Sequence, residues 1–478
     1  ILDWETTDQE QLYRLQRLCA GLHRDVPENI VYLNPSRRLT DEAPRIRQLI
    51  DKYQIGFVIV DSLIAATGSE GNDDLIVPTY NALRTFTTCT RLVLTHMAKA
   101  EREKTHNSPY GCYSADTEIL TRAGWKLHQD WREGEPILCF DPQAEAFRWA
   151  APTQRHVYPY DGPMLHIHNR ATDCLVTPNH RLVVRPAWRL DQAKLRRNAY
   201  PHGWQFIEAR DIGANHWQTP YAAPMAVDET DADVSDDFLR LIGWFVSEGS
   251  LNDGALTLTQ AEGQLATEFA ATLDRLGIAY KITRQQPMYA GREHEKPVHY
   301  VRTRQSGNLA RWFESECGRG AAGKRLPAFV FAASQRQKFI VLNALVDGDG
   351  CRRGDRIEYT TVSKRLADDV QRLAILAGMP ANIRLDAPGE PHQQPRYTVK
   401  IGRVERRSIT LDRERMVAPV PYTGLVYCFT TLTGAYLTRR NGQMAVQGNS
   451  VFVTNYSRAV WRIKKTGGNA DEWLTAGL

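Results

Sequence analysis

The sequence predicts a multidomain protein that combines α/β and α+β parts. Three observations favour this fold class. The chain has 478 residues, more than one hydrophobic core usually serves, with 42% hydrophobic and 24% charged residues, a balance typical of folded domains. Apolar strand-like runs alternate with helical spacing near its start, and a strand-rich segment follows. An apolar helical motif then occurs twice in the middle of the chain.

Charge and hydropathy restrict the partners. No apolar run approaches the roughly 18 residues that a membrane span needs, so we expect no membrane segment. The net charge of +5 identifies no partner, but residues 281–338 carry 12 Lys/Arg against 4 Asp/Glu. This stretch is either a phosphate-binding surface or an ordinary solvated face.

The eight cysteines form no CxxC pair and no zinc-like spacing. We therefore expect reduced thiols and a cytoplasmic location, where any single Cys can act as a nucleophile. The chain opens with Ile1 rather than Met and has no signal-peptide pattern, which favours a fragment of a longer protein.

The first hundred residues predict a parallel, doubly wound sheet with polar residues at the strand tips. The run "GFVIVDSLIAA" predicts a buried strand ending at Asp61, and "RLVLTHMAK" predicts a second strand with His96 at its tip. "ILDWETT" predicts a third strand, which carries Glu5, and "DQEQLYRLQRL" and "APRIRQLIDKY" have helical spacing.

The order of these tips resembles the RecA-like ATPases. The resemblance places Asp61 at the Walker B position, Glu5 at the water-activating glutamate and His96 at the sensor position; a capped loop residue is the alternative for His96. It implies ATP and Mg²⁺ for the complete host domain, which by fold analogy we expect to be oligomeric and to work on DNA. The motif "GRGAAGKR" is rejected as its phosphate loop, because Arg325 replaces the magnesium-binding hydroxyl.

Three separated segments downstream carry residues that can act as nucleophiles or transfer protons. "CYSADTEIL" begins with the nucleophile Cys112, "DCLVTPNHRLVV" carries Thr177 and His180 in a TxxH pattern, and "GLVYCFTTLTGAYLTRRNGQMAVQGNS" ends with Asn449 and Ser450. Their order resembles the splicing blocks of inteins, which have a β-rich Hint horseshoe fold.

The resemblance implies self-excision without cofactors. Cys112 would form a thioester with Gly111, while Thr177 and His180 hold and protonate the amide. Ser450 would then accept the acyl group and Asn449 would cyclise. Two positions depart from the family pattern, and the first is Gly448, which stands where a histidine is usual.

The other departure is Cys428, which occupies a position where relatives carry Asp or Cys. We expect a packing or auxiliary role for this thiol.

The repeated motif comprises "FLRLIGWFVSEGS" and "IVLNALVDGDG", two apolar helices that end in Glu248 and Asp349. Small residues on each helix predict close packing of the two, which brings both carboxylates together. Two neighbouring carboxylates repel each other unless a cation binds between them. Mg²⁺ at this position would activate water for phosphodiester cleavage.

The repeat resembles the LAGLIDADG homing endonucleases. "GKRLPAFVF" matches the lysine-bearing block of that family, so Lys324 is carried over as a phosphate- or water-facing base. The resemblance implies two antiparallel sheets over a groove for double-stranded DNA, cut at the uninterrupted host-gene site with Mg²⁺.

The predicted organisation is therefore a RecA-like fragment interrupted by a Hint domain, itself split by a two-repeat αββ endonuclease. The predicted ranges are 1–111 and 450–478 for the host, 112–235 and 405–449 for the splicing domain, and 236–404 for the endonuclease. Two alternatives remain open: a hedgehog-like domain that cleaves only at Cys112, and an inert insertion in an ATPase.

Overall fold

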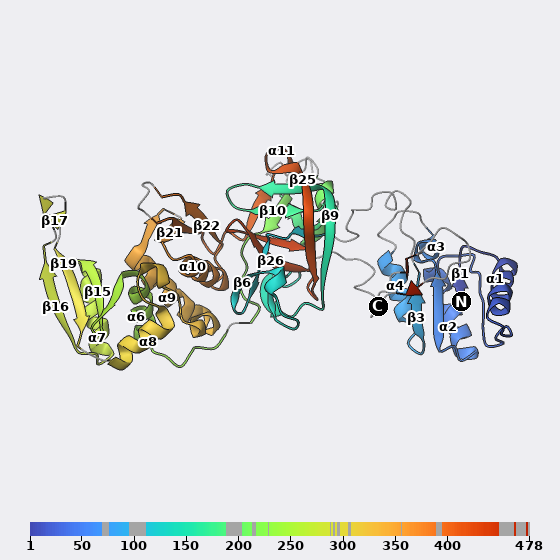
Figure 1. The fold of residues 1–478 in the computed structure, drawn as a ribbon, viewed down its shortest axis with the longest axis horizontal. Helices are drawn as coiled ribbons and strands as arrows, with labels where there is room; N and C mark the ends of the chain where they lie inside the picture. The colour runs from blue at the N-terminus through green and yellow to red at the C-terminus, as the bar shows by residue number, and fades with distance from the viewer. Residues whose placement is uncertain are drawn as a thin grey trace. The chain divides into compact units, whose positions relative to one another are not determined.

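The computed structural model describes residues 1–68, 76–94, 111–187, 203–212, 217–227, 229–286, 288–289, 292–293, 297–304, 307–354, 356–388, 394–448, 463–464 and 475–476. Its contacts divide the chain into two compact units, Ile1–Asn107 with Tyr456–Leu478, and Ser108–Asn455 (Figure 1). Within the described residues, no helix is long and apolar enough to cross a membrane.

The first unit contains a three-stranded parallel sheet in the order β1-β2-β3, as predicted. Its strands are β1 (Leu2–Asp3), β2 (Phe57–Asp61) and β3 (Thr90–Val93). Its helices are α1 (Asp8–Gly21), α2 (Leu39–Lys52), α3 (Leu63–Thr67) and α4 (Ile76–Arg84). In the tail, the short strands β28 (Ile463–Lys464) and β29 (Thr475–Ala476) pair with each other. The other residues of 450–478, which the sequence assigns to the host, lie outside the described residues.

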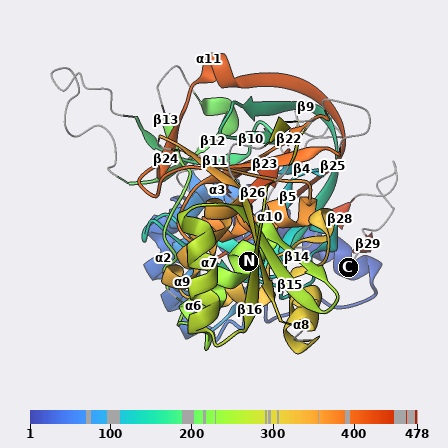
Figure 2. The same cartoon turned by 90° about the vertical axis from the view of Figure 1, so that its left-hand side faces the viewer.

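The second unit begins with a closed barrel of four strands. They are β4 (Tyr113–Ser114), β9 (Gln154–His168), β10 (Asp173–Val176) and β25 (Val417–Thr430). Figure 2 shows β25 as a long curved strand that starts at α11 (Arg413–Met416). It pairs antiparallel with β9 from Val417–Ile167 to Thr430–Gln154, so segments on either side of the repeated motif form one ladder.

The second unit contains two further sheets, built from strands that alternate along the chain with those of the barrel. One has the order β12-β11-β13-β24, and the other β27-β26-β5-β7-β8 with β6 at β5. The first comprises β11 (Arg181–Pro186), β12 (Gln205–Glu208), β13 (Trp217–Pro220) and β24 (Ser408–Leu411). The second comprises β5 (Glu118–Thr121), β6 (Gly124–Leu127), β7 (Ile137–Asp141), β8 (Ala146–Ala150), β26 (Ala435–Arg440) and β27 (Gln443–Gly448). The 3₁₀ turns His128–Asp130 and Ala209–Asp211 connect strands.

The repeated motif forms two copies of the order α-β-β-α-β-β, each with a four-stranded antiparallel sheet. The first copy contains α6 (Asp236–Glu248), β14 (Gly249–Asn252), β15 (Ala255–Ala261), α7 (Gln264–Arg275), β16 (Tyr280–Gln285) and β19 (Val298–Thr303). The second contains α9 (Gln335–Asp349), β20 (Gly350–Arg353), β21 (Arg356–Thr361), α10 (Lys364–Leu376), β22 (Ala381–Asp386) and β23 (Arg396–Ile401).

Smaller elements complete this region. The strands β17 (Met288–Tyr289) and β18 (Arg292–Glu293) form a short hairpin. Helix α8 (Gly307–Cys317) and the 3₁₀ turns Ala321–Gly323 and Ala328–Ala332 lie between the copies. The prediction of an αββ repeat is thus extended by a second helix and hairpin in each copy.

Candidate functional sites

Helices α6 and α9 pack against each other through the small residues that the sequence singled out (Figure 1). A Cβ atom at Gly243 would lie 2.5 Å from Cβ of Ala344, and one at Gly348 would lie 2.6 Å from Cβ of Ser247. Ser247 Oγ donates to the Leu345 carbonyl at 3.1 Å. Larger residues at these glycines would force the helices apart, so the predicted close approach is confirmed.

This packing brings Glu248 and Asp349, the last residues of α6 and α9, close enough to influence each other. Burial, followed by the charge of Asp349, raises the pKa of Glu248 to about 7. Burial also raises the pKa of Asp349, while Lys324 opposes this shift. Two partly buried acids that resist ionisation together are suited to hold a divalent cation.

Lys324 is buried beside them, but its ammonium group is directed at the end of α6. Nζ donates to the carbonyls of Phe245, Val246 and Gly249, the last at 2.8 Å, and lies 4.1 Å from the Phe245 ring centre. Burial lowers the pKa of Lys324 to about 8. The lysine therefore contacts carbonyls at the C-terminal end of α6 and at the start of β14. Its predicted role as a phosphate- or water-facing base stays a prediction.

A cavity of about 510 Å³ opens at these helix ends, lined by both Lys324 and Asp349. Arg319 and Arg396 line the same cavity. One acid, Asp349, and three cationic residues thus line the same cavity, an arrangement suited to a phosphate group and a metal ion.

The second candidate site lies where β4 meets β10. The Cys112 N–H donates to Thr177 Oγ1 at 2.9 Å, and the Thr177 N–H donates to the Cys112 carbonyl at 3.0 Å. The His180 N–H donates to the Thr177 carbonyl at 2.9 Å. The structure therefore brings Cys112, Thr177 and His180 together, and Thr177 contacts the amide nitrogen that the resemblance assigns to it.

His180 is fully buried next to Gly111. Burial lowers its pKa to about 4, while the Gly111 backbone and the Gln447 side chain oppose the shift. A Cβ atom at Gly111 would lie 2.4 Å from the His180 Cα, so only glycine permits this approach. A neutral imidazole beside the Gly111–Cys112 amide can exchange protons with it.

Tyr113 joins the two ends of the segment 112–449. Its Oη donates to the Gly448 carbonyl at 3.0 Å, and its ring centre lies 4.5 Å from that of His180. Gly448 itself lies against β11, since a Cβ atom there would be 2.7 Å from the Arg181 carbonyl. Asn449 and Ser450 lie outside the described residues, but the residue before them is fixed beside the Cys112 neighbourhood.

Cys428 is buried in β25 opposite His156. Its thiol donates to the Phe429 carbonyl at 3.6 Å, and Tyr436 Oη donates to its Sγ at 4.0 Å. Burial raises the pKa of Tyr113, and the nearby Cys428 thiol is the second cause of this shift. These contacts are compatible with the packing or auxiliary role expected for Cys428, which stays a prediction.

In the first unit, β1 and β2 bring Glu5 close to Asp61. Asp3 pairs with Asp61 in the parallel register, and the Trp4 N–H donates to the Asp61 carbonyl at 2.8 Å. Glu5 accepts a hydrogen bond from Ser62 Oγ. The third predicted residue, His96, lies outside the described residues.

Sequence reasoning missed two features. Tyr113 follows the predicted nucleophile directly, but its contact with Gly448 depends on strands far apart in sequence. The other feature is the cluster of His166, His168 and Asp173. The sequence signal that could have indicated it is two histidines separated by one residue on a strand.

Residues 235–318 and 336–410 match the family model described as a LAGLIDADG-like domain. These bounds agree closely with the two copies seen in the fold, so this part of the chain is a LAGLIDADG-like domain. It contains both Glu248 and Asp349.

Curated relatives share low sequence identity with this chain, over part of their length. The chain is 24% identical over 311 residues to an ATP-dependent Clp protease proteolytic subunit of Chlamydomonas moewusii, covering 58% of this chain and 29% of the relative. It is 27% identical to the DNA helicase Hel308 of Thermococcus kodakarensis, over 34% of this chain and 15% of the relative. A DNA gyrase subunit of Mycobacterium gordonae is 25% identical, over 31% of this chain and 28% of the relative. The chain thus spans less than a third of the length of these relatives.

Solved structures include variants of the homing endonuclease I-DmoI, with 17% identity and a TM-score of 0.27, covering 37% of this chain and 87% of that chain. A splice-inactive AceL NrdHF class 3 split intein has 10% identity and a TM-score of 0.23, covering 71% of this chain and 99% of that chain. At such low scores, the assignment of the domain rests on the family-model match.

Proposed function

We propose that this chain is a precursor in which residues 112–449 are an intein that excises itself by protein splicing and also cleaves DNA. The observation that carries the splicing part is the hydrogen bond from Tyr113 to Gly448. It joins the residue that follows Cys112 to the residue before Asn449. Splicing requires both junctions within bonding reach, because proximity supplies most of the rate.

The chemistry follows from the residues at this closed end. The thiolate of Cys112 attacks the Gly111 carbonyl, forming a thioester as the amide C–N bond breaks, and the freed nitrogen takes up a proton. Thr177 holds that nitrogen. The neutral imidazole of His180 takes the thiol proton as the Cys112 thiolate forms, and then supplies this proton to the nitrogen. The hydroxyl of Ser450 then displaces the Cys112 thiol and carries the acyl group as an ester.

The Asn449 side-chain nitrogen next attacks its own carbonyl, which breaks the bond to Ser450 and leaves a succinimide. The ester rearranges to an amide at the new amino group of Ser450. None of these steps requires ATP or a metal.

The DNA-cleaving activity is proposed for the LAGLIDADG-like domain. Glu248 and Asp349 would hold Mg²⁺, which polarises phosphate and activates water when bound. The cavity arginines and the exposed strand β16 offer cationic and polar groups to the backbone of double-stranded DNA. The expected target is the host gene without the insertion.

The host is proposed to be a RecA-like ATPase, with Glu5, Asp61 and His96 in the roles implied by the resemblance. The three curated relatives are named for unrelated activities and match over less than a third of their length. Such a pattern is expected when the shared segment is an insertion rather than the host.

Intact-protein mass spectrometry tests splicing. The unaltered chain should yield a joined host fragment and a free 112–449 product, whereas Cys112→Ala with Asn449→Ala should stay full length. A single cleavage at Cys112 would favour the hedgehog-like alternative, and no mass change would favour an inert insertion. Equal masses for both chains would refute splicing.

Cleavage of DNA has its own test. Asp349→Asn should abolish Mg²⁺-dependent cutting of DNA that carries the uninterrupted host gene. Asp347→Asn is the matched control, because Asp347 lies on the same helix with a side chain 47% exposed, beside Arg352. Undiminished cutting by Asp349→Asn would remove that residue from the site.

A further inference from the structure

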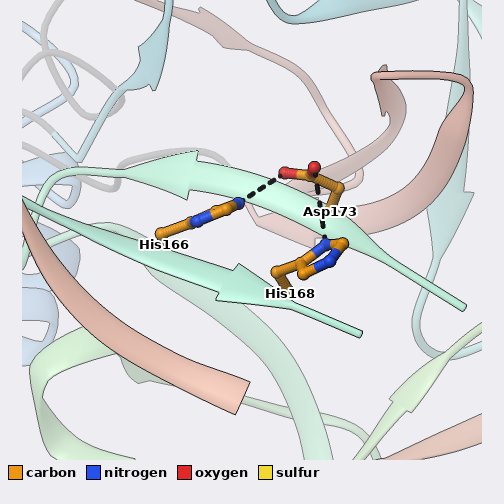
Figure 3. Close-up of side chains that lie close together, drawn as sticks. All are labelled: His166, His168 and Asp173. Atoms are coloured by element: carbon orange, nitrogen blue, oxygen red, sulfur yellow. Dashed lines mark hydrogen bonds and ion pairs between the residues drawn. The ribbon is translucent and has the colours of Figure 1, made fainter. Parts of the chain in front are cut away.

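Two histidines and an aspartate that have no part in the activities proposed above lie together on the hairpin β9–β10 (Figure 3). His166 and His168 alternate on β9 and so share one face of the sheet. Asp173 pairs with His168 across the ladder. His166 Nε2 lies 3.0 Å and His168 Nδ1 3.5 Å from the Asp173 carboxylate.

The three potential ligand atoms lie within 4.8 Å of one another. Ligands about 2.0–2.2 Å from a tetrahedral zinc ion are separated by roughly 3.3–3.6 Å, so only small shifts are required. The strands fix the backbone on both sides of the cluster. Two imidazoles with one carboxylate suit zinc, nickel, copper or iron(II), whereas Mg²⁺ and Ca²⁺ prefer oxygen ligands.

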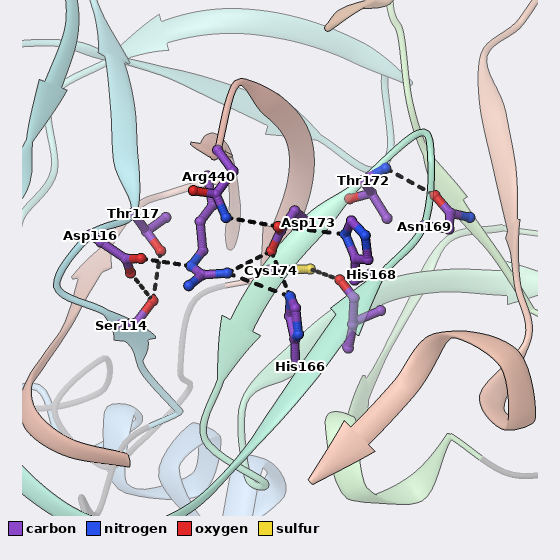
Figure 4. Close-up of polar contacts among 12 residues, drawn as sticks. Ser114, Asp116, Thr117, His166, His168, Asn169, Thr172, Asp173, Cys174 and Arg440 are labelled. Carbon is purple, nitrogen blue, oxygen red and sulfur yellow. Dashed lines mark hydrogen bonds and ion pairs between the residues drawn. The ribbon is translucent and has the colours of Figure 1, made fainter. Parts of the chain in front are cut away.

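The cluster also has a competing cation, Arg440 on β26 (Figure 4). Its Nη1 lies 2.8 Å from Asp173 Oδ1 and 3.5 Å from His166 Nε2. Its Nε donates to Asp116 Oδ2 at 2.9 Å, so the guanidinium has a second carboxylate partner if it leaves Asp173. Asn441 Nδ2 donates to the other Asp173 oxygen at 3.0 Å.

Asp173 is the buried member of the cluster, with a side chain 4% accessible. His166 and His168 are the more exposed members, with side chains 30% and 50% accessible. Solvent can thus reach the cluster from the histidine side.

We propose that His166, His168 and Asp173 form a binding site for one divalent transition-metal ion of the zinc class, with water completing the coordination. Arg440 competes with the metal for Asp173 and so sets the affinity. The site is separate from the Glu248–Asp349 pair, and it does not depend on the proposed splicing or nuclease activities.

The test is isothermal titration of the full chain with ZnCl₂, together with the visible absorption bands of Co²⁺ as a report on coordination. The chain carries Cys112→Ala and Asn449→Ala to keep it intact, and Glu248→Gln with Asp349→Asn to remove the other acidic pair. One equivalent of Zn²⁺ should bind. His166→Ala and His168→Ala should each weaken binding at least about tenfold.

Arg440→Gln should strengthen Zn²⁺ binding, because it removes the competing positive charge while leaving the three ligands in place. His299→Ala is the matched control. His299 lies on β19 of the first copy of the repeated motif, with its Nε2 3.4 Å from the Glu262 carboxylate. Its loss should leave Zn²⁺ binding unchanged. Circular dichroism verifies that each variant is folded.

Binding that survives both His166→Ala and His168→Ala in folded protein would overturn the proposal, as would the absence of binding in the parent chain and in Arg440→Gln. Weaker rather than stronger binding by folded Arg440→Gln would overturn the assigned competition.

Discussion

At the scale of single residues, Tyr113 connects the neighbourhoods of the two junctions of the proposed splicing reaction. Its hydroxyl is buried and donates to the Gly448 carbonyl, which precedes Asn449. We predict that Tyr113→Phe slows Asn449 cyclisation about fivefold or more, because one buried hydrogen bond contributes about 1 kcal/mol to holding that peptide. The branched intermediate should accumulate on a denaturing gel, with its mass confirmed.

Tyr427→Phe is the matched control. Tyr427 is equally buried and its hydroxyl donates to a backbone carbonyl, that of Thr117, at 2.7 Å. It should lose comparable stability without accumulating the intermediate. If Tyr113→Phe spliced like the unaltered chain, the contact would be unimportant for the reaction; if the unaltered chain did not splice, the proposed function itself would fail.

Glu248 supports a prediction on pH. Its pKa is raised from 4.5 to about 7 by burial and by Asp349, so the folded chain binds this proton more tightly than the unfolded chain. Its contribution is favourable below pH 4.5 and is lost as the pH rises through about 7. Without divalent cations, Glu248→Gln should therefore flatten the fall in the free energy of unfolding between pH 5 and 7.

Urea unfolding of the non-splicing chain in EDTA at several pH values measures this effect. Glu414→Gln, on the short helix α11, serves as the control. Adding Mg²⁺ should reverse the trend at pH 7, because a cation between the carboxylates favours their ionised forms. The same slope with and without Glu248 would contradict the assignment.

At the scale of elements, the end of β27 explains why glycine precedes Asn449. A Cβ atom at Gly448 would lie 2.7 Å from the Arg181 carbonyl and 2.9 Å from Phe206 Cδ1. This buried strand end is packed closely against β11. We predict that Gly448→His, which restores the residue usual in inteins, lowers stability and slows splicing.

Thermal unfolding and splicing yield measure this outcome together. Leu432→His, at a turn position 86% exposed, controls for the added imidazole and should change neither quantity. Faster splicing by Gly448→His would show that the strand end can move aside and that a missing histidine limits the rate.

Local patterns predicted the elements best where they are strongly periodic. The helices around Gly243 and Gly348 were predicted with their packing faces, and the strand leading to Asp61 was also found. The motif at 318–325 was rejected as a phosphate loop, and its Lys324 contacts carbonyls at the end of α6. Pairings between distant segments, such as β9 with β25, could not be predicted because no local pattern encodes the partner.

The candidate sites divide in the same way. Cys112, Thr177 and His180 were predicted from their order in the sequence. Hydrogen bonds connect the three residues, while their catalytic roles stay predictions. The contact of Tyr113 with Gly448 and the orientation of Lys324 toward carbonyls depend on packing, which the sequence did not reveal.

At the scale of the whole molecule, Arg439 links the strand-rich part to the LAGLIDADG-like domain. It lies on β26 with its side chain 2% exposed. Its guanidinium contacts Glu118 on β5 at 2.6 Å, and Asp368 and Gln371 on α10 at 2.5 and 2.9 Å. One buried cation thus holds acids from both parts, so we expect them to unfold as one cooperative unit.

We predict that Arg439→Met destabilises this unit by roughly 3 kcal/mol, because Glu118 and Asp368 are left close together without their shared cation. Denaturant unfolding should show the loss, and Arg415→Met, at a side chain 87% exposed, should show almost none. Adding Glu118→Gln and Asp368→Asn to Arg439→Met should recover much of the stability, since the two carboxylates no longer repel each other and Lys364, which loses Asp368, has a side chain 52% exposed. Separate unfolding transitions of the strand-rich part and of the LAGLIDADG-like domain, both within the second unit, would instead mean that these parts fold independently and that Arg439 stabilises only its own strand.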